Sequence, residues 1–221
     1  MNNPSARSRP IILISADLTS GVEPGMVLRS NYAHAVAEAG GMPLVLPADP
    51  AQIPQALDLA DGILISGTVP GTTAPATRRD FERHLIEAAL AQNKPLLGIC
   101  HGMQMIGEVL GGRVLTDDPA LLAEVSAHIP QPVPDVPAHP VEILPESLLG
   151  RCHDGGPVLV NSLHRHRLDE GGSFRVTARA PDGVIEAIEG PGFCLGLQWH
   201  PEYRLSRLDR RIFAAFLERC M

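Results

Sequence analysis

The first hundred residues alternate between short apolar runs and stretches with helical spacing, and this alternation constrains the fold more than any other feature. Apolar runs at 11–15, 43–46 and 63–65 predict buried strands. Apolar side chains recur at helical spacing over 28–39, and 52–60 has the pattern of a short helix. This order predicts an α/β fold with three layers, α/β/α, in which helices cover both faces of a mostly parallel central sheet.

The composition changes after Val114. Prolines crowd the next segment and predict a loop that is neither helix nor central strand; they are Pro130, Pro132, Pro134, Pro137 and Pro140. Turns such as Asp182-Gly183 suit antiparallel pairing of the short strands expected at 141–144, 158–161, 174–180 and 184–188. A closing helix is expected from the stripe Leu205, Leu208, Ile212 and Phe216. We expect one domain over residues 1–221, with 1–9 as a flexible N-terminus.

One cysteine stands where a buried strand gives way to a helix. Cys100 lies between Gly98 and Gly102, after the apolar run 95–97 and before a helical stretch at 103–110. A side chain at such an elbow projects from the sheet, and flanking glycines avoid the crowding that Cβ atoms would cause. The positive end of the helix favours thiolate over thiol. A lone cysteine is usually a small buried residue, but this position predicts a nucleophile.

A histidine and a carboxylate follow a second apolar run, at 193–197. Alternate side chains of a strand point to the same face, so His200 and Glu202 are expected to reach one site. A cysteine nucleophile needs a base, and the base needs an acceptor that fixes its tautomer. We therefore predict that Cys100, His200 and Glu202 are catalytic. The plain alternative for Glu202 is a solvated carboxylate after a strand.

The bulk composition excludes several classes of function. A net charge of −7 argues against a nucleic-acid or anionic-membrane partner, and no apolar stretch is long enough to cross a bilayer. The four cysteines show no Cys-x-x-Cys spacing, and residues 1–10 contain no apolar signal-peptide core, so we expect a reduced, cytoplasmic protein. No His-x-x-x-His pair with a nearby acid occurs, and we predict no metal site and no cofactor. A small-molecule substrate remains.

Several segments together resemble a known family. Gly98 to Gln104, taken with 200–202, resembles the class I glutamine amidotransferase superfamily, whose fold is flavodoxin-like. Further segments look like the gamma-glutamyl-gamma-aminobutyrate hydrolase family; they are 32–47, 79–82, 160–164 and 182–187. The resemblance spans about residues 11 to 216 and its segments occur in order.

The resemblance implies hydrolysis of a gamma-glutamyl amide C–N bond. Cys100 would form a gamma-glutamyl thioester that water hydrolyses to glutamate, while His200 moves the proton and Glu202 orients the imidazole. The backbone N–H groups of Gly67 and His101 would form the oxyanion hole, although Gly67 also suits a simple tight turn. The substrate-binding residues implied are Gln104, Asn161, Ser162 and His164.

The chain departs from the family pattern in three places. It has Ser66-Gly67-Thr68-Val69-Pro70 where the family usually has a Gly-Gly-Gly-Asp run, so the loop is held differently or recognises something else. His101 replaces an arginine, and its backbone N–H is unaffected by the exchange. The run 164–166 is His-Arg-His rather than His-His-Gln, which adds positive charge near the expected pocket. That charge suits an acidic leaving group or, equally, a surface salt bridge.

Two other functions remain open at this point. A glutaminase subunit would pass ammonia to a separate synthetase partner, and a binding protein would use the fold without catalysis. The residues do not identify the amine on the gamma-glutamyl group, and they leave room for a homodimer without indicating its face. Tyr32 is expected to be a core residue. The three cysteines other than Cys100, at positions 152, 194 and 220, are also expected to be structural.

Overall fold

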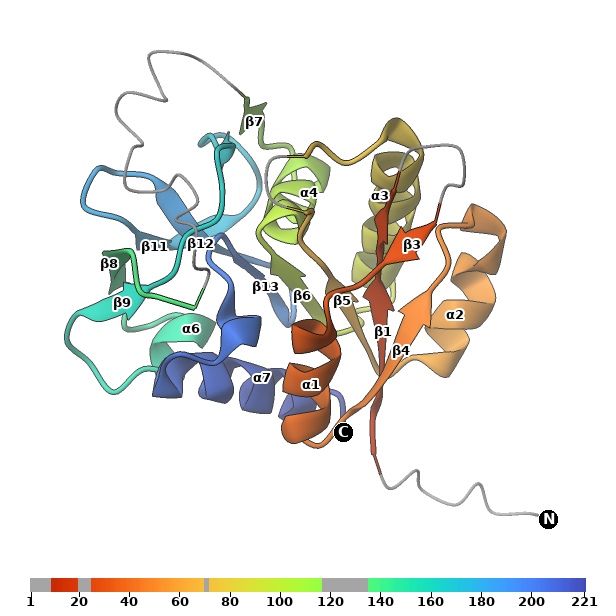
Figure 1. Cartoon of the computed structure of the whole chain (residues 1–221), viewed down its shortest axis with the longest axis horizontal. Helices are drawn as coiled ribbons and strands as arrows, with labels where there is room; N and C mark the ends of the chain where they lie inside the picture. Colours follow the sequence, from red (N-terminus) through yellow and green to blue (C-terminus); the bar gives the residue numbers. More distant parts are fainter. Residues whose placement is uncertain (1–8, 20–24, 70–71, 117–134) are drawn as a thin grey trace.

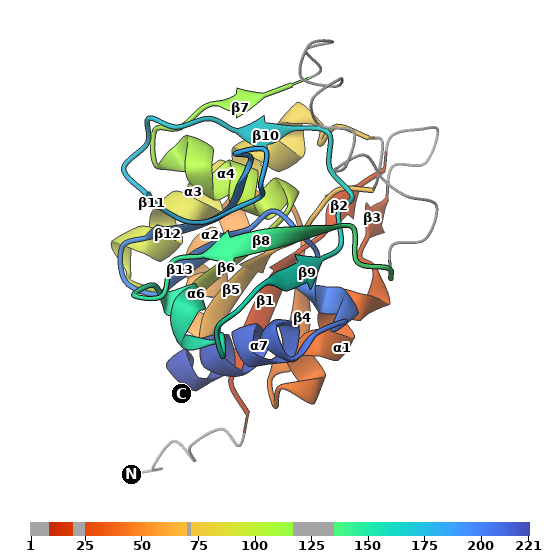
Figure 2. The same cartoon turned by 90° about the vertical axis from the view of Figure 1, so that its left-hand side faces the viewer.

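The structure is a computed structural model of the chain, and it describes residues 9–19, 25–69, 72–116 and 135–221. One sheet dominates it (Figures 1 and 2). Its strands are β1 (Ile11–Ser15), β4 (Met42–Leu46), β5 (Gly62–Ile65), β6 (Leu96–Ile99), β8 (His139–Ile143), β9 (Val158–Val160), β11 (Arg175–Arg179), β12 (Ile185–Gly190) and β13 (Cys194–Leu197). The nine strands lie in the order β4-β1-β5-β6-β13-β12-β11-β8-β9.

The sheet has a parallel part and an antiparallel part. Strands β4, β1, β5, β6 and β13 pair in parallel, whereas β12, β11, β8 and β9 continue the sheet by antiparallel pairing. Strands β5, β6 and β13 are buried along their whole length, as expected of parallel strands covered on both faces. The predicted mostly parallel central sheet with added antiparallel strands is confirmed.

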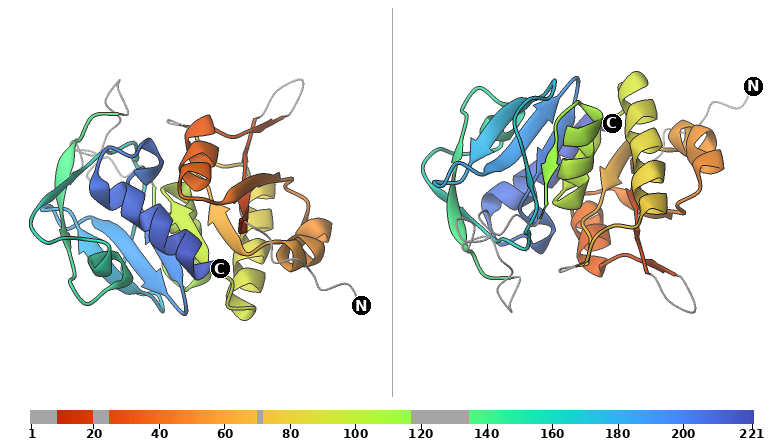
Figure 3. Two further views of the ribbon diagram at one scale, coloured as in Figure 1. Left: turned by 90° about the horizontal axis from the view of Figure 1, so that it is seen from below. Right: turned by 90° about the horizontal axis from the view of Figure 1, so that it is seen from above.

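Helices cover both faces and complete the three predicted layers (Figure 3). One core packs α1 (Ser30–Glu38) and α7 (Arg207–Arg219) against the sheet. A second core packs α2 (Ile53–Leu59), α3 (Ala76–Ala91) and α4 (His101–Val109) against the other face. In the described residues, the other helical segments are η1 (Pro50–Gln52), α6 (Leu148–Arg151) and η2 (Pro201–Tyr203).

Two short ribbons lie beside the main sheet. Strand β2 (Asp17–Leu18) pairs with β3 (Met26–Val27), and β7 (Val114–Leu115) pairs with β10 (Arg167–Leu168). The second ribbon covers α4 (Figure 2). A Cβ atom at Gly107 would lie 2.5 Å from the Leu168 side chain, so a glycine is needed for this close approach.

The proline-rich segment differs partly from the prediction. Residues 130–134 lie outside the described residues, but Pro140 lies within strand β8 rather than in a loop. β8 pairs with β11 only at residues 142–143, so at Pro140 the strand has a neighbour on the β9 side alone. A proline, which has no backbone N–H to donate, is tolerated where one side of a strand is unpaired. The expected flexible N-terminus also lies outside the described residues, except for residue 9. In the part of the chain that is described, no helix has both the length and the apolarity to cross a membrane.

Candidate active site

Cys100 occupies a strained elbow between β6 and α4. Its backbone has φ 54° and ψ −106°, a conformation that costs a non-glycine residue about 1–3 kcal/mol. The Cys100 N–H donates to the Leu197 carbonyl at 2.7 Å. A Cβ atom at Gly98 would lie 2.6 Å from the Gly102 carbonyl oxygen, and one at Gly102 would lie 2.1 Å from that of Ile65. The elbow and the need for both glycines are therefore as predicted.

His200 and Glu202 meet, although not by strand alternation. Strand β13 ends at Leu197, His200 caps the 3-10 helix η2, and Glu202 lies within that helix. The His200 Nδ1 atom lies 2.7 Å from Glu202 Oε1, and both side chains are almost wholly buried. Asn161 fixes the His200 backbone, because its Oδ1 accepts from the His200 N–H at 2.9 Å and its Nδ2 donates to the His200 carbonyl at 3.2 Å.

The electrostatics around His200 favour the imidazolium. Burial by itself lowers the pKa of His200, but the negative charges of Glu202 and Cys100 and their hydrogen bonds to the imidazole outweigh it and raise that pKa to about 10. A charged imidazole beside a cysteine holds the sulfur as thiolate. The arrangement therefore suits nucleophilic attack by Cys100.

The other cysteines lack this environment. Burial raises the pKa of Cys194 and of Cys220 to about 12, and it also raises the pKa of Cys152. Cys194 lies in β13, and Cys220 directly follows α7. Their thiols stay protonated and packed at neutral pH, as expected of structural cysteines.

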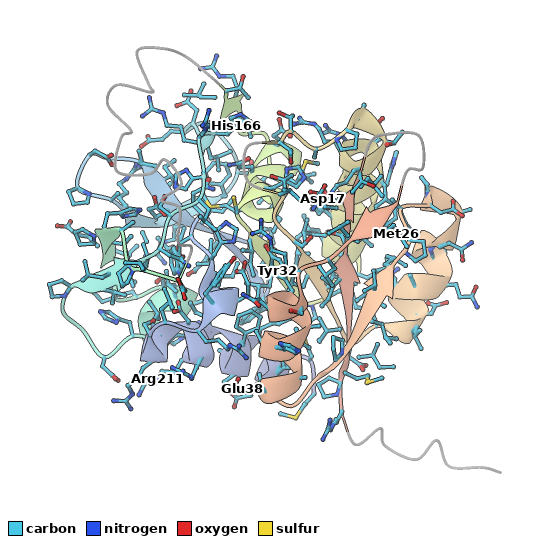
Figure 4. All side chains as sticks on the ribbon, in the orientation of Figure 1. Asp17, Met26, Tyr32, Glu38, His166 and Arg211 are labelled. Atoms are coloured by element: carbon cyan, nitrogen blue, oxygen red, sulfur yellow. The ribbon has the colours of Figure 1, made fainter. Side chains whose placement is uncertain are left out.

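Gly67 lies against the candidate triad, but its N–H already has a partner. That N–H donates to the Tyr32 hydroxyl oxygen at 2.9 Å. A Cβ atom at Gly67 would lie 2.8 Å from the same oxygen and 3.2 Å from His200 Cε1. Burial raises the pKa of Tyr32 well above its usual value, and the charges of Glu202 and Cys100 raise it further, so the phenol is neutral. The hydroxyl of Tyr32, which is labelled near the centre of Figure 4, therefore accepts the hydrogen bond of the Gly67 N–H, the group that was expected to bind the oxyanion.

A buried arginine holds the loop that contains Gly67. Arg78, on α3, is fully buried and donates to Asp17 Oδ1 at 2.7 Å and to Glu82 Oε1 at 2.9 Å. It also donates to the Ser66 carbonyl at 2.9 Å and to the Gly67 carbonyl at 3.3 Å. Asp17, labelled in Figure 4, accepts in turn from the Val69 N–H at 2.8 Å. The loop that lacks the family's acidic position is thus fixed by a buried guanidinium.

The same network reaches the residue after the nucleophile. His101 Nε2 lies 2.7 Å from Glu82 Oε2, and the Ser15 hydroxyl donates to Glu82 Oε1 at 2.6 Å. Although burial opposes it, the neighbouring His101 and Arg78 lower the pKa of Glu82. His101 begins α4, so its backbone N–H has no acceptor within the helix and is available for an oxyanion.

A pocket of about 120 Å³ opens beside Cys100. Among the described residues that line it, several are cationic or titratable and none is a carboxylate. The charged and histidine members are Arg79, His101, His164, Arg165 and His166. His166 lies near β7 (Figure 4). Gln104 also lines the pocket, and its Nε2 donates to Gln198 Oε1 at 3.1 Å. Asn161 and Ser162 are not among the lining residues, so of the four implied substrate-binding residues only Gln104 and His164 border this pocket.

Sequence reasoning misses the residues that hold the site together. The pattern predicts Tyr32 as a core residue and does not single out Arg78 or Asp17. The one useful signal is the position of Arg78 four residues before Glu82, which places both on one face of a helix. Their burial depends on which face of α3 packs on the sheet, and the pattern alone does not give that.

The fold and the elbow define an α/β protein of the glutamine amidotransferase type. A glutamine amidotransferase from Thermotoga maritima superimposes with a TM-score of 0.61 at 17% identity, covering 88% of this chain and 76% of that one. A Thermoplasma acidophilum protein, provisionally named as part of a GMP synthase, gives a TM-score of 0.70 at 18% identity, covering 96% and 94%. These likenesses show the fold.

The chain belongs to the Peptidase C26 family, whose profile matches residues 10–202. A gamma-glutamyl-gamma-aminobutyrate hydrolase of Escherichia coli O157:H7 is 34% identical over 221 residues, covering 87% of this chain and 86% of that protein. A glutamine amidotransferase-like protein, YvdE, of Lactococcus lactis is 32% identical over 208 residues, covering 85% and 86%. The protein is therefore an enzyme of the Peptidase C26 type.

Proposed function

We propose that this protein hydrolyses a gamma-glutamyl amide, with Cys100 as nucleophile, His200 as general acid and base, and Glu202 as the group that orients His200. The observation that carries the proposal is the buried 2.7 Å contact between His200 and Glu202 beside the strained Cys100 elbow. Strain of this kind persists where surrounding structure enforces it, and it is concentrated at functional sites.

The reaction has two halves. The Cys100 thiolate adds to the side-chain carbonyl carbon of the glutamyl group, and the carbonyl oxygen becomes an oxyanion. As the carbonyl re-forms, the C–N bond breaks, the His200 imidazolium protonates the departing amine, and a thioester remains. Neutral His200 then takes a proton from water, whose oxygen attacks the thioester, and release of glutamate restores the thiolate.

Two backbone N–H groups are suited to the oxyanion. That of His101 stands at the start of α4, directly after the nucleophile. That of Gly67 contributes only when the Tyr32 hydroxyl gives up its hydrogen bond, so substrate binding displaces Tyr32. One oxyanion-hole donor is worth about 3–4 kcal/mol of transition-state stabilisation.

The pocket suits a conjugate whose amine carries an acidic group. Arg165 is exposed, lines the pocket together with His166, and forms no ion pair with any of the described residues. Arg79, which also lines it, is bound to Glu108 at 2.9 Å. A carboxylate on the leaving amine, as in gamma-glutamyl-gamma-aminobutyrate, complements this charge. The name of the Escherichia coli relative supports the same substrate class.

The test is release of glutamate by the purified protein from a panel of gamma-glutamyl amides. The panel contains gamma-glutamyl-gamma-aminobutyrate, glutamine and a conjugate of an uncharged amine, and Cys100→Ala is the control. We expect turnover that depends on Cys100 and is fastest for the acidic conjugate. Equal turnover by Cys100→Ala would refute the nucleophile, and a preference for the uncharged conjugate would refute the role of Arg165.

The second candidate is a glutaminase that supplies ammonia to a synthetase. The amidotransferase-like name of the Lactococcus lactis relative favours it. It predicts that glutamine alone is hydrolysed, slowly, and that a synthetase partner raises the rate. Brisk turnover of a conjugate without a partner would exclude it.

A further inference from the structure

Three buried side chains converge at the edge of the pocket without a part in the proposed hydrolysis. His139 lies in β8, His164 follows β9, and Glu186 lies in β12. The Nε2 atoms of His139 and His164 lie 3.6 and 3.5 Å from Glu186 Oε1. The side chains are 5%, 1% and 0% exposed, and one ligand atom from each lies within 4.8 Å of the other two.

Hydrogen bonds orient both imidazoles toward this point. The Nδ1 of His139 lies 3.1 Å from the Pro140 carbonyl oxygen, and the Nδ1 of His164 lies 3.1 Å from that of His166. A carbonyl only accepts, so each Nδ1 carries the proton, and in the neutral imidazole each Nε2 presents a lone pair to Glu186. Backbone carbonyls fix metal-binding histidines in this tautomer in many proteins.

The separations fit a metal ion at the centre. Bonds of about 2.0–2.1 Å in a tetrahedral site place neighbouring ligand atoms about 3.4 Å apart. The two nitrogen–oxygen distances, 3.6 and 3.5 Å, are close to that value. Two imidazole nitrogens and a carboxylate oxygen at these distances form a donor set that a divalent ion can bind through all three atoms.

We propose that His139, His164 and Glu186 bind a zinc ion. Two imidazoles and one carboxylate are ligands that zinc accepts, and no described cysteine belongs to the set. The ion joins β8, β12 and the segment after β9, and it holds His164 where that residue borders the pocket. The proposal departs from the expectation of no metal site, which depended on short histidine spacings, because these ligands come from three separate elements.

The test measures metal in the intact protein, purified without a histidine tag. Protein treated with a chelator is titrated with Zn²⁺ and, separately, with Co²⁺, and bound metal is determined by elemental analysis. We expect one equivalent of zinc, and a cobalt spectrum without a sulfur-to-metal charge-transfer band. His139→Ala and Glu186→Gln should each weaken binding at least about 100-fold, because each removes a direct ligand.

Two matched variants separate this site from others. His84→Ala removes an exposed histidine on α3 and should leave binding unchanged. Cys100→Ser removes the thiol of the candidate active site and should also leave it unchanged. Should the ligand variants fail to fold, the cobalt spectrum and the stoichiometry of the wild-type protein decide alone. Failure of the wild-type protein to bind an equivalent of zinc, or loss of binding only in Cys100→Ser, overturns the proposal.

Discussion

Replacement of Arg78 by methionine should destabilise the protein far more than the same change one residue later. The Arg78 side chain is 0% exposed, and its removal leaves the buried carboxylates of Asp17 and Glu82 without their guanidinium. Removing one partner of a buried ion pair costs about 3–5 kcal/mol. In the variant, Asp17 still accepts the hydrogen bond of the Val69 N–H, and Glu82 still contacts the His101 imidazole. We therefore expect the loss of stability to fall in the lower half of that range.

The matched control is Arg79→Met. Arg79 pairs with Glu108, but their side chains are 32% and 19% exposed, and a pair of that kind contributes about 0–1 kcal/mol. In a chain of this size about 2–4 °C in Tm corresponds to 1 kcal/mol, so Arg78→Met should lower Tm by about 10 °C and Arg79→Met by a few degrees. Thermal and urea unfolding at neutral pH measure both. Equal losses of stability in the two variants would refute the reasoning.

Three further outcomes follow from the site. Glu202→Gln removes the charge that raises the pKa of His200, so kcat should fall by about 10²–10⁴. The raised pKa of about 10 predicts that wild-type activity persists until the pH rises through that value, so the alkaline limb of the pH–rate profile should move to lower pH in the variant. Gly102→Ala places a Cβ atom 2.1 Å from the Ile65 carbonyl oxygen and should lower the free energy of unfolding by about 3 kcal/mol or more, measured in urea. Iodoacetamide at neutral pH should modify Cys100 before Cys194, whose pKa burial raises to about 12, and peptide mass spectrometry should show that order.

The architecture was predictable because its signals are local. Buried parallel strands such as β5 and β6 appear as unbroken apolar runs, and the helices between them keep their spacing on the sequence. The elbow at Cys100 was predictable for the same reason, since two glycines flank it within five residues. The pairing of His200 with Glu202 was also expected, but for a wrong reason, because β13 ends at Leu197, before both residues, and the pair lies at η2, with His200 as its cap and Glu202 within it.

The contacts that fix the site were not predictable, because they join distant segments. Arg78 and Arg79 are adjacent and chemically identical, yet one is fully buried and the other is partly exposed. The difference depends on how α3 is rotated against the sheet, which follows from packing over its whole length. The cluster of His139, His164 and Glu186 likewise exists only because strands β8 and β12 and the segment after β9 bring these residues together.

The two departures from the family pattern nearest to Cys100 meet on one helix. α3 supplies Arg78, which holds the carbonyls of Ser66 and Gly67, and Glu82, which holds the side chain of His101. Arg78 and Glu82 also bind each other. The two candidate oxyanion donors, one in the loop after β5 and the other at the start of α4, are therefore linked through the buried ion pair of Arg78 and Glu82. A change at Glu82 should disturb both donors together, whereas a change at Tyr32 should reach the N–H of Gly67 and the candidate triad residue Glu202 but not the N–H of His101, because the Tyr32 hydroxyl binds the Gly67 N–H and interacts with Glu202.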